Sequence, residues 1–142
     1  MSQTYARESD PASDSGIMVM TPATLPYVVE DMRRRLGGDE RLMADIIAMF
    51  VVDCPLRLAQ IKIAVEARDA EEIRISAHAL KGAAGNLSAR PIVQLALALE
   101  LMAQGRPIDS RALDAAWARL EIEGARLLAA LQRASNAGRS LR

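Results

Sequence analysis

The sequence predicts an all-α protein that folds as an antiparallel four-helix bundle, with a short additional N-terminal helix and a disordered leader. Aromatic residues make up only 3% of the 142-residue chain, and β-branched residues are scattered rather than alternating, which disfavours strands. Apolar residues instead recur at spacings of three and four in several long segments. With 51% hydrophobic residues, the chain is long and apolar enough to form one domain with its own core.

The N-terminal part of the chain divides into a leader and a short helix. Residues 1–22 are rich in Ser, Asp, Thr and Pro without an apolar period, which is typical of a disordered leader. A short helix is expected over residues 24–36, ended by Gly37 and Gly38. The run Arg33–Arg35 falls in its last turn, where cations complement the helix dipole, although a contact with a partner is an alternative.

A long amphipathic helix is predicted to follow Asp39. Pro55 interrupts it, and we expect a kink or a fresh start there because proline lacks the backbone donor. The apolar positions expected to face the core are Leu42, Ile46, Met49, Phe50, Cys54, Leu58, Ile61 and Val65.

Three further boundaries complete the expected bundle. Asp69 is expected to cap a helix with Glu71 and Glu72 in its first turn, and Arg90-Pro91 begins the next helix. Asp109 or Ser110 is expected to cap the last one. Its apolar positions are Leu113, Ala116, Trp117, Leu120, Leu127, Leu128 and Leu131. The folded part is therefore predicted to span residues 23–135, with a flexible tail at 136–142.

Composition excludes several classes of function. Basic and acidic residues both number 18, so the net charge is zero, and nucleic-acid binding is not expected. Cys54 is the sole cysteine, which excludes an internal disulfide or a thiolate metal cluster and suits a reducing compartment. No apolar run approaches the roughly 20 residues needed to span a bilayer. We expect a cytoplasmic protein with no membrane contact and no intrinsic cofactor.

The only histidine, His78, is predicted to point away from the core of its helix. A helical projection places Ile73, Ala77, Leu80, Ala84 and Leu87 on one apolar stripe, with His78 nearly opposite. The residues that share the exposed face with His78 are Glu71, Arg74, Ile75, Lys81, Gly82 and Gly85. Ile75 either forms the apolar part of a docking patch or edges the core.

Glycine inside a helix costs roughly 0.5–1 kcal/mol relative to alanine, so Gly82 needs another explanation. The lack of a side chain one turn from His78 would let a second molecule approach the ring. Gly85 is weaker evidence for such an approach, because close packing or a nearby helix end would explain a glycine at this position equally well. Lys81 would stabilise an anionic group carried on His78.

An exposed imidazole is largely neutral at neutral pH, because its unperturbed pKa is about 6.5, and it is then a nucleophile. His78 is therefore suited to accept and return a phosphoryl group, a transfer that needs mainly positioning and charge neutralisation. No glycine-rich loop or second carboxylate cluster is present to bind Mg-ATP. We expect a phosphoryl carrier without autokinase activity rather than a kinase.

The stretch AHALKGAAGNLSA, residues 77–89, resembles the signature of the histidine phosphotransfer (HPt) family. The resemblance extends over about residues 39–104 and includes the pair Leu99-Glu100. It departs from the family at Ser88, where glycine is usual, which affects only the local helix end. The resemblance implies a four-helix bundle in which His78 is phosphorylated, Lys81 assists and Gly82 leaves room for a receiver domain.

The resemblance also implies partners: receiver domains of hybrid histidine kinases and response regulators, in a two-component multistep phosphorelay. We expect Mg²⁺ on the partner receiver domain, none on this chain, and a monomeric carrier. Three alternatives stay open on the residues themselves: a histidine that is structural or merely solvated, a haem or metal ligand, and an adaptor that binds receivers without being phosphorylated. The lack of a second histidine disfavours His78 as a haem or metal ligand.

Overall fold

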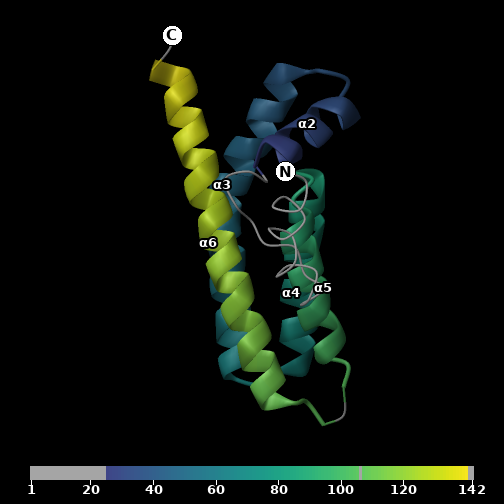
Figure 1. Ribbon diagram of the computed structural model, residues 1–142. Helices are drawn as coiled ribbons and strands as arrows, with labels where there is room; N and C mark the ends of the chain where they lie inside the picture. Colours follow the sequence, from purple (N-terminus) through teal and green to yellow (C-terminus); the bar gives the residue numbers. More distant parts are fainter. Residues whose placement is uncertain (1–24, 106, 141–142) are drawn as a thin grey trace, which may run out of the picture.

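The computed structural model describes residues 25–105 and 107–140, and within these residues helices joined by short turns are present and strands are not. The helices are α2 (Leu25–Arg35), α3 (Glu40–Glu66), α4 (Ala70–Asn86), α5 (Arg90–Met102) and α6 (Ser110–Ser140) (Figure 1). The predicted all-α class is confirmed. The predicted leader, residues 1–22, lies outside the described residues.

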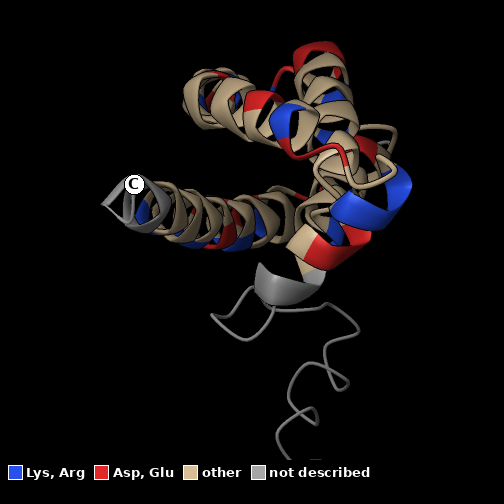
Figure 2. Cartoon of the chain, turned by 90° about the horizontal axis from the view of Figure 1, so that it is seen from above, with Lys and Arg blue, Asp and Glu red and all other residues tan. Residues whose placement is uncertain are grey.

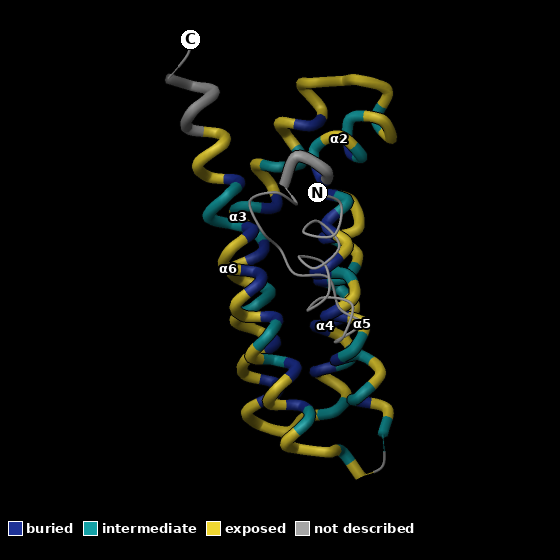
Figure 3. Tube along the Cα trace, in the orientation of Figure 1, coloured by how far each residue is buried: buried dark blue, intermediate teal, exposed yellow. Residues whose placement is uncertain are grey.

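Helices α3 to α6 form the bundle and α2 closes one of its ends. In the ring of contacts, α4 packs against α3 and α5, while α6 packs against α5 and α3. The short connections make successive helices antiparallel. Buried segments face the interior and exposed segments face outward (Figure 3). Helix α2 lies beside the start of α3, at the opposite end of the bundle from the α5–α6 connection (Figure 1).

The predicted helix starts are confirmed by side-chain caps. The Asp39 carboxylate accepts the backbone N–H of Leu42 at 3.0 Å, and Asp69 accepts that of Glu72 at 3.2 Å. Asp109, rather than Ser110, caps α6 by accepting the N–H of Ala112 at 3.0 Å. Each cap satisfies a donor that the first helical turn leaves unpaired.

Helix α4 ends in a left-handed residue that is not glycine. Ser88 has φ +62°, a conformation that favours glycine. The backbone N–H of Ala89 donates to the carbonyl of Ala84, and that of Ser88 to the carbonyl of Gly85, which is the paired hydrogen bonding of a Schellman motif. The departure from glycine at Ser88 therefore leaves this helix end intact.

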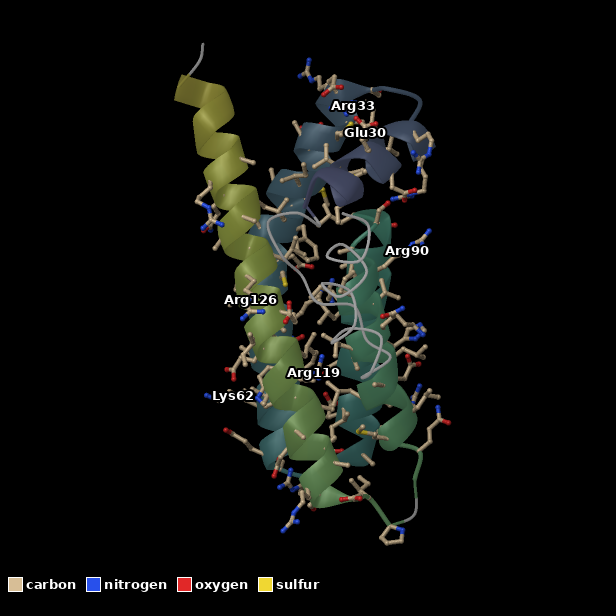
Figure 4. All side chains as sticks on the ribbon, viewed as in Figure 1. Glu30, Arg33, Lys62, Arg90, Arg119 and Arg126 are labelled. Atoms are coloured by element: carbon tan, nitrogen blue, oxygen red, sulfur yellow. The ribbon has the colours of Figure 1, made fainter. Side chains whose placement is uncertain are left out.

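Arg35, at the end of α2, forms hydrogen bonds with the same turn. Its Nε donates to the Ser88 hydroxyl at 2.9 Å, and its terminal nitrogen donates to the carbonyl of Asn86 at 2.8 Å. The other two arginines of the run pair locally, Arg33 with Glu30 and Glu40 and Arg34 with Asp31. Figure 2 shows the basic and acidic segments side by side on α2, and Figure 4 labels Glu30 beside Arg33.

One expectation about the core face of α3 is wrong. Leu42 and Met49, predicted to be core residues, are 41% and 69% exposed. The residues that face the core are Met43, Phe50, Cys54, Ile61, Ala64 and Val65. The pattern of three- and four-residue spacings therefore combined two different faces of one helix.

At Pro55 the expectation was a kink or a fresh start rather than an end; the helix does not end there, and no fresh start occurs. Helix α3 continues through this residue from Glu40 to Glu66. Pro55 is exposed, and the hydrogen bond that it cannot form is the one to the carbonyl of Val51, one turn earlier in the helix. The C-terminal boundary also differs, because α6 extends to Ser140 instead of ending at residue 135.

The cap at Asp69 starts the helix that carries His78, so its loss should destabilise the bundle. We expect Asp69→Ala to lower the free energy of unfolding by about 1 kcal/mol, because a first-turn N–H loses its acceptor. Asp45→Ala, which removes an exposed carboxylate inside α3, is the matched control and should change stability by less than half as much. Urea denaturation followed by circular dichroism measures both. Equal effects would show that the cap contributes nothing.

Candidate functional site

His78 lies on the outer face of α4. Its side chain is 66% exposed, whereas Ile73, Ala77 and Leu80 on the inner face are fully buried. The predicted orientation of the ring is therefore observed. The burial of the apolar stripe fixes the rotation of α4, and the rotation of α4 in turn presents the imidazole to solvent.

A carboxylate from the neighbouring helix binds the ring. His78 Nδ1 lies 3.0 Å from Oε2 of Glu100, which belongs to α5. An ionised carboxylate only accepts hydrogen bonds, so Nδ1 carries the proton in this contact. In the neutral ring, the lone pair is then on Nε2, the nitrogen that has no hydrogen-bond partner among residues 25–105 and 107–140.

Lys81 completes a cluster of three side chains. Its Nζ lies 2.8 Å from Oε1 of Glu100, so the two carboxylate oxygens are divided between Lys81 and His78. The hydrogen bond from Lys81 lowers the pKa of Glu100, partial burial opposes this effect, and His78 adds to it. The net effect is a lowered pKa, so the Glu100 carboxylate is ionised at neutral pH between its two partners, although its side chain is only 13% exposed.

Glu100 was not among the predicted site residues. It was named only as part of the pair Leu99-Glu100, within the segment that resembles the HPt family. The sequence does contain a signal for it. In two antiparallel helices joined by a tight turn, residues at equal distances from the turn lie level with each other. His78 and Glu100 are equally far from Ala89, the N-cap of α5. Locating the turn at Arg90-Pro91 therefore predicts the pairing.

The two glycines of the predicted site leave open space. A Cβ atom placed on Gly82 or on Gly85 would meet no atom within 4 Å. Neither glycine is therefore required by close packing inside the molecule, which removes one alternative for Gly85. The carbonyl of Gly85 also accepts a hydrogen bond from Arg35, so the open stretch ends at the α4–α5 turn.

The remaining predicted residues lie toward the N-terminal end of α4. Glu71 and Arg74 form an ion pair at 2.8 Å; the hydrogen bond from Arg74 lowers the pKa of Glu71. Ile75 is 45% exposed, so it does not merely edge the core. These residues occupy the same helix as His78, but they form no hydrogen bond or ion pair with the cluster of His78, Lys81 and Glu100.

A metal site and a reactive cysteine are the other kinds of chemistry to consider in the described parts of the chain, and neither is supported. No group of three or more His, Cys, Asp or Glu side chains that could hold a metal ion occurs in the described parts of the chain. Burial raises the pKa of the Cys54 thiol to about 11, with a smaller contribution from Asp53. This thiol is therefore protonated at neutral pH and is a poor nucleophile.

The sequence matches the model of the Hpt domain over residues 45–137, a segment that runs from the first turns of α3 into α6. The chain belongs to the Hpt domain family. Neither a curated protein nor a solved structure gives a match. Helix α2 precedes the matched segment, so Arg35 is an addition to the part that the Hpt model describes.

Membership of the Hpt family gives the chain a histidine phosphotransfer role in a phosphorelay, as a phosphocarrier that interacts with receiver domains. None of the five helices in the described parts of the chain is both long and apolar enough to cross a membrane. The exposed ring of His78 lies within the matched segment.

The shifted pKa of Glu100 predicts how the cluster responds to acid. The folded state holds the pKa of Glu100 below its ordinary value of 4.5, so near that pH the folded protein binds fewer protons than the unfolded protein. The stability from Glu100 is therefore present above pH 4.5 and is lost as the pH falls through the lower folded-state value.

We expect Glu100→Gln to lose less stability than the wild type between about pH 6 and about pH 3. Glu121→Gln is the matched control, since Glu121 is exposed on α6, and it should follow the wild-type profile. Denaturation curves across this pH range give the comparison. A Glu100→Gln profile parallel to the wild type would contradict an ionised Glu100 in the folded protein.

Proposed function

We propose that His78 carries the phosphoryl group, accepting it from an aspartyl phosphate on one receiver domain and passing it to an aspartate on another. The observation that carries this proposal is the hydrogen bond from Nδ1 to Glu100 at 3.0 Å on a ring that is 66% exposed. It leaves the nucleophilic nitrogen Nε2 free on the solvent side.

The transfer balances without a further reactant. The Nε2 lone pair attacks phosphorus, an N–P bond forms, and the bond between phosphorus and the aspartate oxygen breaks. The electron pair of that bond leaves with the carboxylate of the receiver. The second transfer runs this step in reverse toward another aspartate. We expect the receiver domain to supply Mg²⁺, which neutralises charge on the phosphoryl oxygens.

Glu100 acts as a positioning residue in this scheme. When Nε2 bonds to phosphorus while Nδ1 keeps its proton, the ring becomes an imidazolium cation. The adjacent carboxylate stabilises that cation, because Oε2 lies 3.0 Å from the protonated nitrogen and little water screens the pair at a side chain that is 13% exposed. Glu100 also fixes which ring nitrogen is nucleophilic.

Lys81 is suited to neutralise the phosphoryl group. In the structure its ammonium group is held 2.8 Å from Glu100 Oε1, on the same carboxylate that binds His78. A lysine side chain is flexible and carries a compact charge. When the phosphorus atom is bonded to Nε2, Lys81 can pair with the phosphoryl oxygens while Glu100 stays with the imidazolium.

The surface around the ring fits a docked receiver. Gly82 is exposed and has open space where a side chain would be. Ile75 on α4 and Leu97 on α5, one turn before Glu100, are exposed apolar side chains. An open approach beside the nucleophile, with apolar side chains near it, suits a protein partner better than a small molecule.

The direct test is transfer from a receiver domain that carries labelled phosphate. We expect the wild-type chain to gain a label that is lost in acid and retained in alkali, as an N–P bond is, and we expect His78→Gln to gain none. Asn86→Gln, a change of an exposed residue further along α4, is the control and should be labelled normally. Incubation with Mg-ATP alone should label none of the proteins.

Each result distinguishes the proposed phosphoryl carrier from one of its alternatives. Label on His78→Gln would overturn the assignment of His78. Stable binding of the receiver without any label would favour the adaptor, and label from Mg-ATP alone would contradict the expected lack of autokinase activity.

Gly82 gives an independent prediction about docking. We expect Gly82→Gln to fold normally and to be more stable by about 0.5–1 kcal/mol, because glycine is a poor helix residue and an added Cβ meets no atom within 4 Å. It should nevertheless slow phosphotransfer at least tenfold by obstructing the receiver. Ala118→Gln, on the exposed surface of α6, is the control. Transfer kinetics unchanged in Gly82→Gln would show that this part of the surface is not contacted.

A further inference from the structure

Both ends of α4, the helix that carries His78, adjoin a residue whose backbone conformation favours glycine. Arg68 has φ +55° just before the Asp69 cap, and Ser88 has φ +62° just after the helix ends. No other residue with a side chain has a positive φ in the described parts of the chain. Each conformation is unfavourable without glycine, so each needs contacts that stabilise it.

A guanidinium group supplies such contacts at each end. Arg68 uses its own side chain, which donates to both carboxylate oxygens of Asp114 on α6 at 2.7 and 2.8 Å. The Ser88 hydroxyl instead accepts a hydrogen bond from Arg35 of α2 at 2.9 Å. It also forms a hydrogen bond with Asp31, whose carboxylate lies 3.5 Å from Arg35 Nε. We call Asp31, Arg35 and Ser88 the Ser88 cluster.

Arg35 also binds the last turn of α4 directly. Its terminal nitrogen donates to the carbonyl of Asn86 at 2.8 Å and to that of Gly85 at 3.3 Å. The last carbonyls of a helix have few partners within the helix itself. Val28 and Met32 are buried and fix α2 at this end of the bundle (Figure 1), which places Arg35 beside the turn.

Two glycines separate His78 from this turn, and both belong to the hydrogen bonds of the site residues. In an α-helix, each N–H donates to the carbonyl four residues earlier. Gly82 therefore donates to the carbonyl of His78. Gly85 donates in the same way to the carbonyl of Lys81. Because glycine is a poor helix residue, unwinding that starts at the turn would release the backbone of Lys81 first and that of His78 next.

We propose that Arg35 is a positioning residue for phosphotransfer, which keeps the end of α4 helical and so keeps the ring of His78 on Glu100. The proposal rests on His78 as the phosphorylated residue. Ser88 makes the contact necessary, because a glycine there would form the turn without strain. Helix α2 precedes the segment that the Hpt model matches, so the family match does not include this contact.

The test combines the loss of Arg35 with relief of the strain at Ser88. We expect Arg35→Met to slow transfer from a phosphorylated receiver domain to His78 about fivefold at saturating receiver. Ser88→Gly should transfer like the wild type. In the Ser88→Gly background, Arg35→Met should slow transfer by less than about twofold, because the turn no longer needs the contact. Arg33→Met is the matched control, since Arg33 pairs with acidic residues and not with the turn.

A second substitution at Ser88 separates the hydroxyl from the backbone conformation. Ser88→Ala and Ser88→Gly both remove the hydroxyl that Arg35 binds, but only glycine relieves the positive φ. We expect Ser88→Ala to slow transfer as Arg35→Met does. Circular dichroism at the assay temperature should show that all variants are folded.

The ring of His78 gives a readout that a loss of stability alone would not change. As the only histidine of the chain, it gives a single pair of ring signals in ¹⁵N NMR. At a pH where the ring is neutral, we expect the wild type to carry the proton on Nδ1, opposite Glu100. Arg35→Met should shift the signals toward a mixture of tautomers, and Ser88→Gly in addition should restore them.

Three results would overturn the proposal. Equal slowing by Arg35→Met in both backgrounds would assign Arg35 to a direct contact with the receiver. Equal rates in Ser88→Ala and Ser88→Gly would show that the strain at this turn does not matter, and an unchanged tautomer in Arg35→Met would separate Arg35 from the ring. The tautomer measurement needs no phosphate, so it tests Arg35 even if the wild type takes no label on His78.

Discussion

The antiparallel pairing of α4 with α5 is the constraint on which the site depends. His78 and Glu100 come from different helices and lie at equal distances from Ala89. A shift of one helical turn in this register would separate the imidazole from the carboxylate by about 5 Å. Because Lys81 is also on α4, the same shift would displace it from Glu100, and a partly buried charge that loses its partners is unfavourable. The register therefore both orients the ring and stabilises the carboxylate beside it.

A residue outside the family match holds that register at the turn. Ser88 has a positive φ that costs roughly 1–2 kcal/mol for a residue with a side chain. Arg35 binds the Ser88 hydroxyl and the Asn86 carbonyl, so α2 supplies contacts that offset part of this cost. Asp31 takes part as well, since a hydrogen bond with Ser88 is the main cause of its lowered pKa. Helix α2 thus acts on the turn between the two site helices.

The sequence was sufficient for features determined by neighbours along the chain. The caps at Asp39 and Asp69 and the outward direction of His78 follow from local spacing, and all three are observed. Contacts between helices need more than local spacing. The position of Glu100 beside His78 follows only once the α4–α5 turn is located, and the contact of Arg35 with Ser88 depends on how α2 packs. On α3, residues at three- and four-residue spacing belong to a buried and an exposed face at once, and local spacing alone does not separate them.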